Sequence, residues 1–392
     1  MRGDMLNILL LGLVSFFTDL STEMVYPLIP LYLTSALGAT PAVVGVIEGV
    51  AESLASLLKV FSGYLSDRFQ NKKLIAFTGY ATSLFYKLAL LLAGSWAGIL
   101  GARIIDRFGK GIRTAPRDVL VSESAGKNRM GRSFGLHKAL DMAGSAAGIL
   151  ITYFLLRSGD GSFNYQKIFM ISVIPAVFGL SMFIFIKEKK DPRQTKKHEP
   201  FWKNIRNIDR QLKIYLLVVC LFTLGNSSNS FLLLKAKSTG FDDTSVILLY
   251  FLFNMTASLL SIPFGGLSDR VGRKKLLLSG YIVFAVCYLG FAFSISRLQM
   301  VVVFVLYGVY TAMIGGVERA FVAEIAPQQL KGTMLGLHST VTGIALLPAS
   351  VIAGLLWSVF GAAVPFVFGA FMSLLAAVIL LLFMKETPYA QI

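Results

Sequence analysis

SGYLSDRFQNKKL at residues 62–74 and FGGLSDRVGRKKL at residues 264–276 are two copies of one pattern, separated by 202 positions. Eight of their thirteen positions are identical. A second pair of segments, VSESAGKNRMGRSFGLH at 121–137 and VAEIAPQQLKGTMLGLH at 322–338, matches at an offset of 201. Two independent matches at nearly half of the 392-residue length indicate an internal duplication.

The composition around these copies is that of a membrane protein. Hydrophobic residues make up 55% of the chain and charged residues only 15%, whereas soluble domains average about 45–50% and about 25%. These values argue against a soluble enzyme and against a disordered chain. The two cysteines, Cys220 and Cys287, lie in apolar runs without C-x-x-C spacing, so neither a disulfide framework nor a thiolate metal site is expected.

Apolar runs long enough to cross about 30 Å of hydrocarbon recur along the chain. We predict twelve spans, at residues 6–35, 42–66, 74–94, 96–122, 132–156, 167–186, 213–236, 244–268, 276–295, 299–323, 332–357 and 363–384. The first run is too long for a cleavable signal peptide and lacks a small-residue cleavage site. The segment between the sixth and seventh spans is polar and basic, which is typical of a linker.

The basic residues sort by side of the membrane. The formal net charge is +16; 23 of the 37 lysines and arginines fall in segments on the side of the N-terminus, and five fall in the opposite loops. This excess predicts a multi-pass protein of the cytoplasmic membrane with both termini in the cytoplasm. Most of the charge is thereby a topology signal, and nucleic acid is not an expected partner.

Span count and duplication together predict the architecture. We expect an all-α integral membrane fold of twelve transmembrane helices in two parallel six-helix repeats. The N-terminal bundle would cover residues 1–186, the cytoplasmic linker 187–212 and the C-terminal bundle 213–392. Two parallel halves of this kind suit a transporter whose halves rock against each other, and do not suit a symmetric channel.

The two loop copies resemble a motif of the major facilitator superfamily, G-x-L-[SA]-D-R-x-G-R-[RK], and the resemblance extends over essentially the whole chain. The first copy departs from the motif at Gln70 and Asn71. The resemblance implies secondary transport by alternating access, with a cytoplasmic clasp that closes one state. The clasp residues would be Gly63, Asp67, Arg68, Glu123, Gly265, Asp269, Arg270 and Glu324. The alternative is a static pair of charges at helix ends.

The predicted fourth span is unusually charged. Its charges occupy a face of roughly 140° on a helical projection, and they are Arg103, Asp106, Arg107, Lys110, Arg113, Arg117 and Asp118. Each charge facing lipid would cost about 2.5–3.5 kcal/mol near the bilayer centre, so the face must meet water or partner charges. The alternative is a segment lying on the membrane surface. The resemblance implies a wall of the central cavity, although Asp106 and Arg107 replace the usual Gln and Gly of the family's fourth helix.

Other ionisable residues lie at membrane depth in the first half. Such groups are functional candidates because they are expensive to bury. We take the following as candidates for proton coupling: Asp19, Glu23, Glu48, Glu52, Asp106, His137 and Asp141. In the second half, Glu318 and Arg319 are expected to form a local pair, and charge handling is therefore expected in the first half.

The substrate candidates combine both halves. Arg103, Arg107 and Lys110 suit an anionic group on a small organic solute, with neutral contacts from Asn226, Asn229 and Tyr310. The opposite interpretation is that the acids and bases neutralise one another and the solute is cationic or zwitterionic.

The sequence leaves several other functions open. A drug/proton antiporter is the main alternative, although DMAGSAAG at 141–148 lacks the proline of that family signature. A metal-ion transporter and an intramembrane enzyme rank lower, because H-E-x-x-H is absent and the acids pair with bases. No G-x-x-x-x-G-K-[ST] segment indicates an ATPase. We expect no cofactor and no bound metal; the expected partners of a monomer are a small-molecule substrate, protons and the lipid bilayer.

Overall fold

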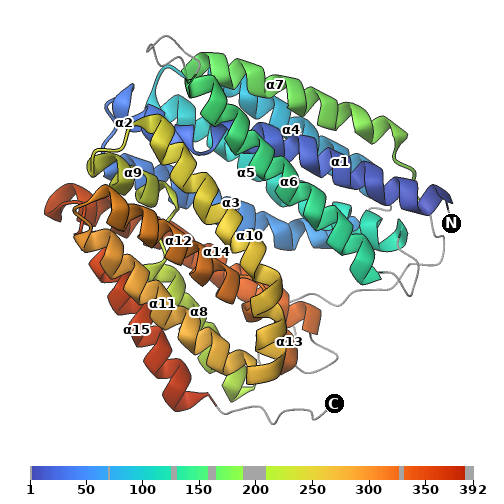
Figure 1. The fold of residues 1–392 in the computed structure, drawn as a ribbon. Coiled ribbons are helices and arrows are strands. Elements are labelled where there is room, and N and C mark those ends of the chain that lie inside the picture. Colours follow the sequence, from blue (N-terminus) through green and yellow to red (C-terminus); the bar gives the residue numbers. More distant parts are fainter. Residues whose placement is uncertain are drawn as a thin grey trace. The chain divides into compact units, whose positions relative to one another are not determined.

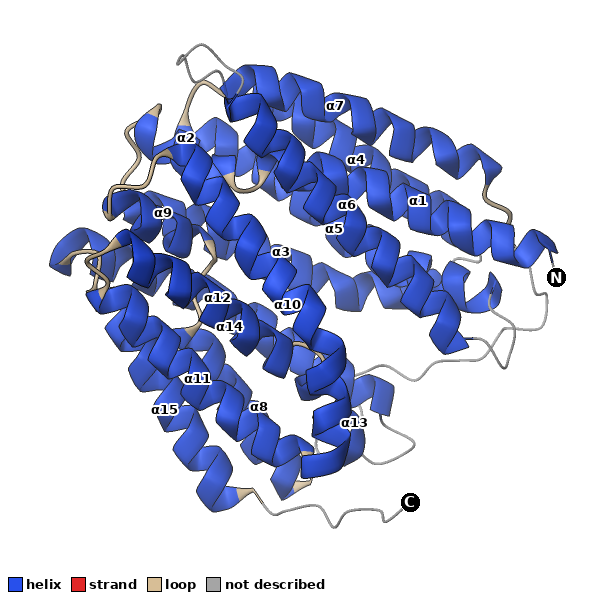
Figure 2. Ribbon diagram, in the orientation of Figure 1, coloured by secondary structure: helices blue, strands red, loops and turns tan. Residues whose placement is uncertain are grey.

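A computed structural model describes residues 2–68, 71–124, 130–157, 165–188, 209–325 and 331–384. Within these ranges the chain forms helices joined by short loops, and no strand occurs there (Figures 1 and 2). The predicted all-α membrane fold is confirmed.

The described chain divides into two compact units, Met1–Pro192 with Asp242–Phe251 and Arg193–Phe241 with Leu252–Ile392. The predicted boundaries at 186 and 212 stay a prediction. The helices of the first half are α1 (Arg2–Val25), α2 (Leu28–Ser35), α3 (Pro41–Arg68), α4 (Lys72–Leu92), α5 (Trp96–Ser124), α6 (Met130–Arg157), α7 (Tyr165–Met182) and the 3₁₀ turn η1 (Phe183–Phe185).

The second half follows the same order of helices, except that its tenth span is broken where the fourth is continuous. It contains α8 (Arg210–Gly225), α9 (Ser230–Ser238), α10 (Asp243–Val271), α11 (Arg273–Phe293), α12 (Arg297–Ile314), α13 (Val317–Ile325), α14 (Lys331–Phe360) and α15 (Val364–Phe383). Asp242 caps the start of α10: its carboxylate accepts from the Ser245 hydroxyl at 2.6 Å and from the Ser245 amide at 3.3 Å. These hydrogen bonds lower the pKa of Asp242 below its usual value.

Eleven segments of the described chain are long and apolar enough to cross a membrane. The predicted span that is missing from these eleven is α5, because its charges reduce its mean hydropathy. Its 29 residues give a length of about 43 Å, which exceeds the hydrocarbon thickness. Since α5 packs against α3 and α4 inside its unit, it completes the predicted set of twelve and does not lie on the membrane surface.

Three predicted spans are broken into two helices within the described residues. The first span breaks between Val25 and Leu28, and the seventh between Gly225 and Ser230. At the repeat offset of 201 these two breaks fall at the same position. The tenth span breaks at Gly315 and Gly316, between α12 and α13. Interrupted membrane helices leave backbone groups outside the helical ladder, which is why they are common at transporter binding sites.

Equivalent helix pairs pack together in the two units. In the first unit α1 packs against α6 and α7, and α4 packs against α5 and α7. In the second unit α8 packs against α14 and α15, and α11 packs against α12 and α15. This correspondence supports the duplication inferred from the loop motif.

Glycines set the closest helix contacts. A Cβ on Gly144 of α6 would lie 2.2 Å from the carbonyl oxygen of Phe16 on α1, and one on Gly148 would lie 2.4 Å from that of Leu20. In the second unit Gly225 of α8 and Gly369 of α15 face each other in the same way. Small residues allow this approach of backbones, which drives helix association in lipid.

Candidate functional site

The charged face of α5 is turned into the first unit. Arg103, Asp106 and Arg107 are buried, with 0%, 1% and 3% of their surface exposed. Arg113 is also buried, whereas Lys110 is exposed. The charges nearest the middle of the helix therefore meet protein partners.

Those partners are the two glutamates predicted to share one face of the second span. Arg103 Nη2 donates to Glu48 Oε2 at 2.8 Å, and Arg107 Nη2 lies 2.6 Å from Glu52 Oε1. Asp106 lies between both guanidinium groups, at 3.7 Å from Arg103 Nη1 and 3.8 Å from Arg107 Nε. Such pairing offsets much of the cost of removing these ions from water.

The break in the first span contributes an aromatic face to this network. Tyr26 lies between α1 and α2, and its ring centroid is 5.1 Å from Arg103 Cζ and 5.8 Å from Arg107 Cζ. A cation above an aromatic ring is stabilised, more strongly when water is excluded. The break therefore lies beside the two arginines.

One residue of this network was not predicted from the sequence. Lys87 of α4 is fully buried; its Nζ lies 4.2 Å from the Tyr86 ring centroid and has no hydrogen-bond partner among the described residues. Asp106 is the acid that interacts most strongly with it. A lysine within an apolar span, in FYKLALLL at 85–92, is a signal that could have identified it.

The six charges of this network balance. Three bases, Lys87, Arg103 and Arg107, face three acids. We call this set of six the ion-pair cluster; its acids are Glu48, Glu52 and Asp106. With all six groups ionised, the cluster carries no net charge.

A second group of predicted residues meets where α1 crosses α6. Ser15 Oγ donates to Asp141 Oδ1 at 2.7 Å, and the Asp19 and Asp141 carboxyl groups interact electrostatically. Arg113 and Lys110 also interact electrostatically with Asp19. The glycine contacts on α6 bring the two backbones close enough for these side chains to meet.

The remaining predicted proton-coupling residues lie elsewhere in the unit. Glu23 is half-buried on α1, and its closest cationic neighbours are Lys110 and Arg107. His137 is buried on α6. Neither residue belongs to the ion-pair cluster as defined above.

The second unit brings the predicted neutral residues together at the α8–α9 break. Asn226 Nδ2 donates to Tyr310 Oη at 3.1 Å, and Tyr288 Oη donates to Asn226 Oδ1 at 3.4 Å. Tyr307 Oη donates to Asn229 Oδ1 at 2.9 Å. Tyr288 and Tyr307 were not predicted, because aromatic residues in an apolar span are ordinary core residues by composition.

These tyrosines continue into an aromatic cluster. Phe284 stacks on Tyr288 at 3.9 Å between ring centroids, and Tyr310 meets Phe284 edge to face at 4.8 Å. Tyr307 and Tyr310 lie 5.2 Å apart. We call this set, with the two asparagines, the amide–tyrosine cluster; it offers ring faces and neutral hydrogen-bonding groups to a ligand.

The two glutamates of the predicted clasp pair with bases that were not predicted as clasp residues. Glu123 pairs with Lys72, and Glu324 Oε2 accepts from Arg273 Nη1 at 2.7 Å. These bases lie within the two loop copies and are related by an offset of 201, so the contacts shift by one residue from the sequence alignment at 202. Gly265 and Arg270 lie near the end of α10, with Arg270 exposed, while the surroundings of Gly63, Asp67, Arg68 and Asp269 lie outside what the structure describes.

The next lysine of each motif has a separate role. Lys73 Nζ donates to the carbonyl oxygens of Ile184 and Ile186, at 3.3 and 2.6 Å. Its counterpart Lys274 donates to those of Leu381 and Met384, at 3.3 and 2.5 Å. Each lysine thus caps the last helix of its own half, where carbonyl groups lack helical partners.

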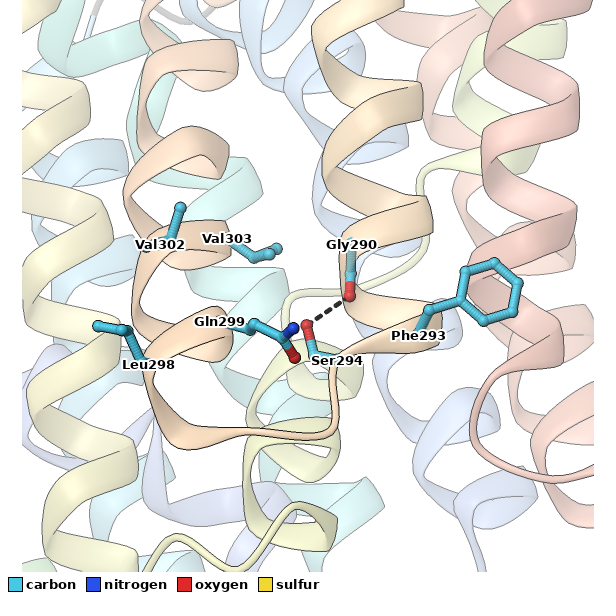
Figure 3. Close-up of a pocket in the computed structure, with 7 residues that line it drawn as sticks. All are labelled: Gly290, Phe293, Ser294, Leu298, Gln299, Val302 and Val303. Atoms are coloured by element: carbon cyan, nitrogen blue, oxygen red, sulfur yellow. Dashed lines mark hydrogen bonds between the residues drawn. The ribbon is translucent and has the colours of Figure 1, made fainter.

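One open pocket of about 400 Å³ lies at the loop between α11 and α12 (Figure 3). Its lining is mostly apolar, and Ser294 Oγ in it donates to the Gly290 carbonyl at 2.5 Å. None of the predicted substrate or proton residues lines it. Across the described ranges, no three side chains of His, Cys, Asp or Glu come together as a metal site.

The model of the Major Facilitator Superfamily matches residues 11–234 and 214–391. The chain belongs to the major facilitator superfamily. An uncharacterised MFS-type transporter of Methanocaldococcus jannaschii is 37% identical to this chain. The match covers 96% of this chain and 94% of the relative. A multidrug resistance efflux pump homologue of Lactococcus lactis is 23% identical, covering 82% of this chain and 81% of the relative.

Solved structures confirm the major facilitator fold. A mutant form of the nucleoside transporter NupG aligns with a TM-score of 0.83 at 11% identity, covering 97% of this chain and all of that one. A D-xylose-proton symporter aligns with a TM-score of 0.77 at 18% identity, covering 98% and 99%. This major facilitator protein is a multi-pass secondary transporter, and not an enzyme.

Proposed function

We propose that this transporter is coupled to protons and that the coupling proton is held between Asp19 and Asp141. The observation that carries the proposal is the contact of Ser15 on α1 with Asp141 on α6, one helical turn from Asp19, with an electrostatic interaction between the two carboxyl groups. Two ionised carboxylates near each other repel, so one proton on the pair stabilises it. Losing that proton leaves two like charges close together in a medium of low dielectric.

The surroundings allow the pair to exist in both states. Ser15 donates to Asp141, and the bases Lys110 and Arg113 face the pair, so the doubly ionised state is also compensated. A change of proton occupancy alters the attraction between α1 and α6. Because α1 ends at a break, proton binding would be linked to the position of Tyr26, which directly follows α1.

The solute that fits best is a ring-bearing compound without excess negative charge. The anionic preference predicted from the sequence depended on free guanidinium groups. Arg103 is fully buried and both arginines are paired with acids, which supports a cationic or zwitterionic solute instead. The amide–tyrosine cluster supports the same class, since its rings and neutral groups suit a planar solute.

Topology, domain boundaries and the clasp form part of the same proposal. We place the protein in the cytoplasmic membrane as a monomer, with both termini in the cytoplasm, on the distribution of basic residues. We propose that residues 187–212 link a bundle of residues 1–186 to one of residues 213–392. Glu123 and Glu324 would act as clasp residues through Lys72 and Arg273.

The test is transport in sealed vesicles with an imposed pH gradient. The panel contains tetracycline and ethidium as ring-bearing compounds, uridine and D-xylose as neutral solutes, and salicylate as an anion. We expect gradient-driven flux of a zwitterionic or cationic ring compound. In Asp19→Asn and Asp141→Asn, driven flux should fall to the level of protein-free vesicles, while solute exchange without net proton movement is retained.

Asp118→Asn is the matched control, because its carboxylate is 45% exposed and pairs with the adjacent Arg117. It should keep driven flux near that of the wild type. Flux that ignores the gradient, or driven flux that survives in both Asp19→Asn and Asp141→Asn, would contradict the proton proposal. Selective transport of salicylate would contradict the proposal for the solute.

A further inference from the structure

The broken end of α1 presents a polar face at membrane depth. Asp19, Glu23 and Tyr26 follow one another at spacings of four and three residues, so they lie on one side of the helix, and each is half-buried. The exposed part of a charged group at this depth cannot face lipid without a large cost. This side of α1 therefore meets water or a solute.

Glu23 has no ion-pair partner of its own, unlike Glu48 and Glu52. No lysine, arginine or histidine of the described ranges forms an ion pair with its carboxylate. Its polar contact is a long hydrogen bond, in which Tyr250 Oη donates to Glu23 Oε2 at 3.4 Å. A carboxylate on an exposed face without an ion pair can take its counter-ion from outside the protein.

Two tyrosines share this end of α1 with Glu23. Tyr250 lies in the segment of α10 that belongs to the first unit, and its ring centroid is 6.0 Å from that of Tyr26, with 40° between the ring planes. The guanidinium groups of Arg103 and Arg107 already lie over the Tyr26 ring, so this ring accepts positive charge. A carboxylate with two tyrosine rings is a combination that binds an ammonium or another organic cation.

The end of α1 adds partial negative charge at the same place. α1 ends at Val25, and the Tyr26 amide donates to the Thr22 carbonyl at 2.8 Å. Pro27 has no amide hydrogen, so the Glu23 carbonyl has no helical donor four residues further on. The C-terminal end of a helix stabilises a cation, and the interrupted helices of transporters hold cations at such ends.

The bases around Glu23 are balanced by other acids. Those that interact electrostatically with it are Lys110, Arg107 and Lys87. Arg107 and Lys87 belong to the ion-pair cluster, whose six charges balance. Lys110 and Arg113 face the proposed coupling pair, Asp19 and Asp141. When that pair has lost its proton, two bases meet two carboxylates, and the negative charge of Glu23 is left over.

We propose that Glu23, Tyr26 and Tyr250 form the subsite that binds the cationic group of a ring-bearing solute. The assignment rests on the proposed function, since it locates the positive charge of the solute class given there. Glu23 supplies the counter-ion, the two tyrosine rings contact the cation, and the end of α1 adds its partial negative charge. Glu23 is thereby a substrate ligand, a role different from the proton coupling expected from the sequence.

The test is equilibrium binding of radiolabelled tetraphenylphosphonium to purified protein in lipid nanodiscs, at about pH 8 and with empty nanodiscs subtracted. Tetraphenylborate, an anion of the same shape, is the comparison. We expect saturable binding of the cation and none of the anion. Glu23→Gln should weaken binding about tenfold or more, whereas Glu23→Asp, which keeps the charge, should retain most of it. Tyr250→Leu should weaken binding severalfold, and Tyr250→Phe, which keeps the ring, should stay within about twofold of the wild type.

Asp118→Asn, which removes an acid outside this face, is the control and should bind as the wild type does. If Glu23→Gln does not fold, the comparison of Tyr250→Leu with Tyr250→Phe decides the outcome. Binding that is absent from the wild type, or equally strong in Glu23→Gln, would overturn the proposal. Because binding is measured without a gradient, a protein that binds the cation through Glu23 while its flux ignores the pH gradient would support the subsite and contradict only the coupling pair.

Discussion

At the scale of single residues, the ion pair of Arg103 and Glu48 is the most deeply buried one described, with both side chains at or below 1% exposure. Removing one partner leaves an unpaired charge in the membrane interior. We expect Glu48→Gln to lower the free energy of unfolding by about 3–5 kcal/mol. Thermal unfolding in detergent, followed by tryptophan fluorescence, measures the change.

The double variant Glu48→Gln with Arg103→Met should recover most of that loss, because it removes both charges. Asp118→Asn breaks a partly exposed pair and should cost about 0–1 kcal/mol. A loss in Glu48→Gln no larger than in Asp118→Asn would show that Arg103 finds other compensation.

The sequence predicted the charged face of α5 and the shared face of Glu48 and Glu52, because helical periodicity assigns residues to one side of a helix. It could not predict which acid meets which base, since that depends on how α3 crosses α5. Lys87 was not predicted, because a single lysine in an apolar span does not form a cluster of charges in the sequence. Its importance follows only from the balance of charge around Asp106.

At the scale of helices, the contact between α1 and α6 depends on glycine. A side chain on Gly144 would meet the backbone of Phe16, which cannot move aside as a flexible side chain can. We expect Gly144→Ala to separate the helices and lower the unfolding temperature by several degrees, with reduced yield of folded protein. Gly101→Ala on α5, where nothing lies within 4 Å, is the matched control and should change little.

Analytical size exclusion and thermal unfolding of both glycine variants measure the effect. If Gly144→Ala unfolds at the same temperature as Gly101→Ala, the helices must be able to adjust, and the glycine contact does not limit their approach.

Two of the three helix breaks coincide with sequence signals. Pro27 and Pro30 lie at the break in the first span, and NSSNS at 226–230 contains the hydrogen-bonding groups of the break in the seventh. The break at Gly315 and Gly316 was not predicted, because paired glycines also occur in continuous membrane helices. What decides it is the set of contacts holding α13, which involves residues distant in sequence.

At the scale of the whole molecule, the duplicated loop motif predicts equal behaviour of the two clasp pairs. If Lys72–Glu123 and Arg273–Glu324 hold the same conformational state, breaking either should increase cytoplasmic accessibility. We expect Glu123→Lys to raise, severalfold, the labelling of a cysteine introduced near the cytoplasmic end of the transport pathway. The comparison is with the parent protein that carries this cysteine alone. Reversing the pair, Lys72→Glu with Glu123→Lys, should restore the parent level.

The labelling experiment requires Cys220 and Cys287 to be replaced by serine first. Labelling that is unchanged in Glu123→Lys and in Glu324→Lys would favour the alternative of static charge pairs at helix ends.

The duplication was readable from the sequence, but its register was not. Alignment of identical letters gave an offset of 202 through the loop, whereas the contacts of Lys72 and Lys73 correspond to those of Arg273 and Lys274, at 201. The loop before α4 is longer than that before α11. After the loop, residues that make equivalent contacts are therefore 201 positions apart, whereas the identical residues are 202 positions apart.

The lysine caps of the two halves bear on how such a chain could arise. Lys73 fastens the end of α7 to the start of α4, and Glu188 returns from beyond η1 to accept from the α4 amides of Lys72 and Lys73, at 2.7 and 3.3 Å. In a six-helix unit with these contacts, the position of the last helix is fixed by residues of the same unit. An ancestral gene encoding one half would already have specified a closed unit, ready to be copied end to end.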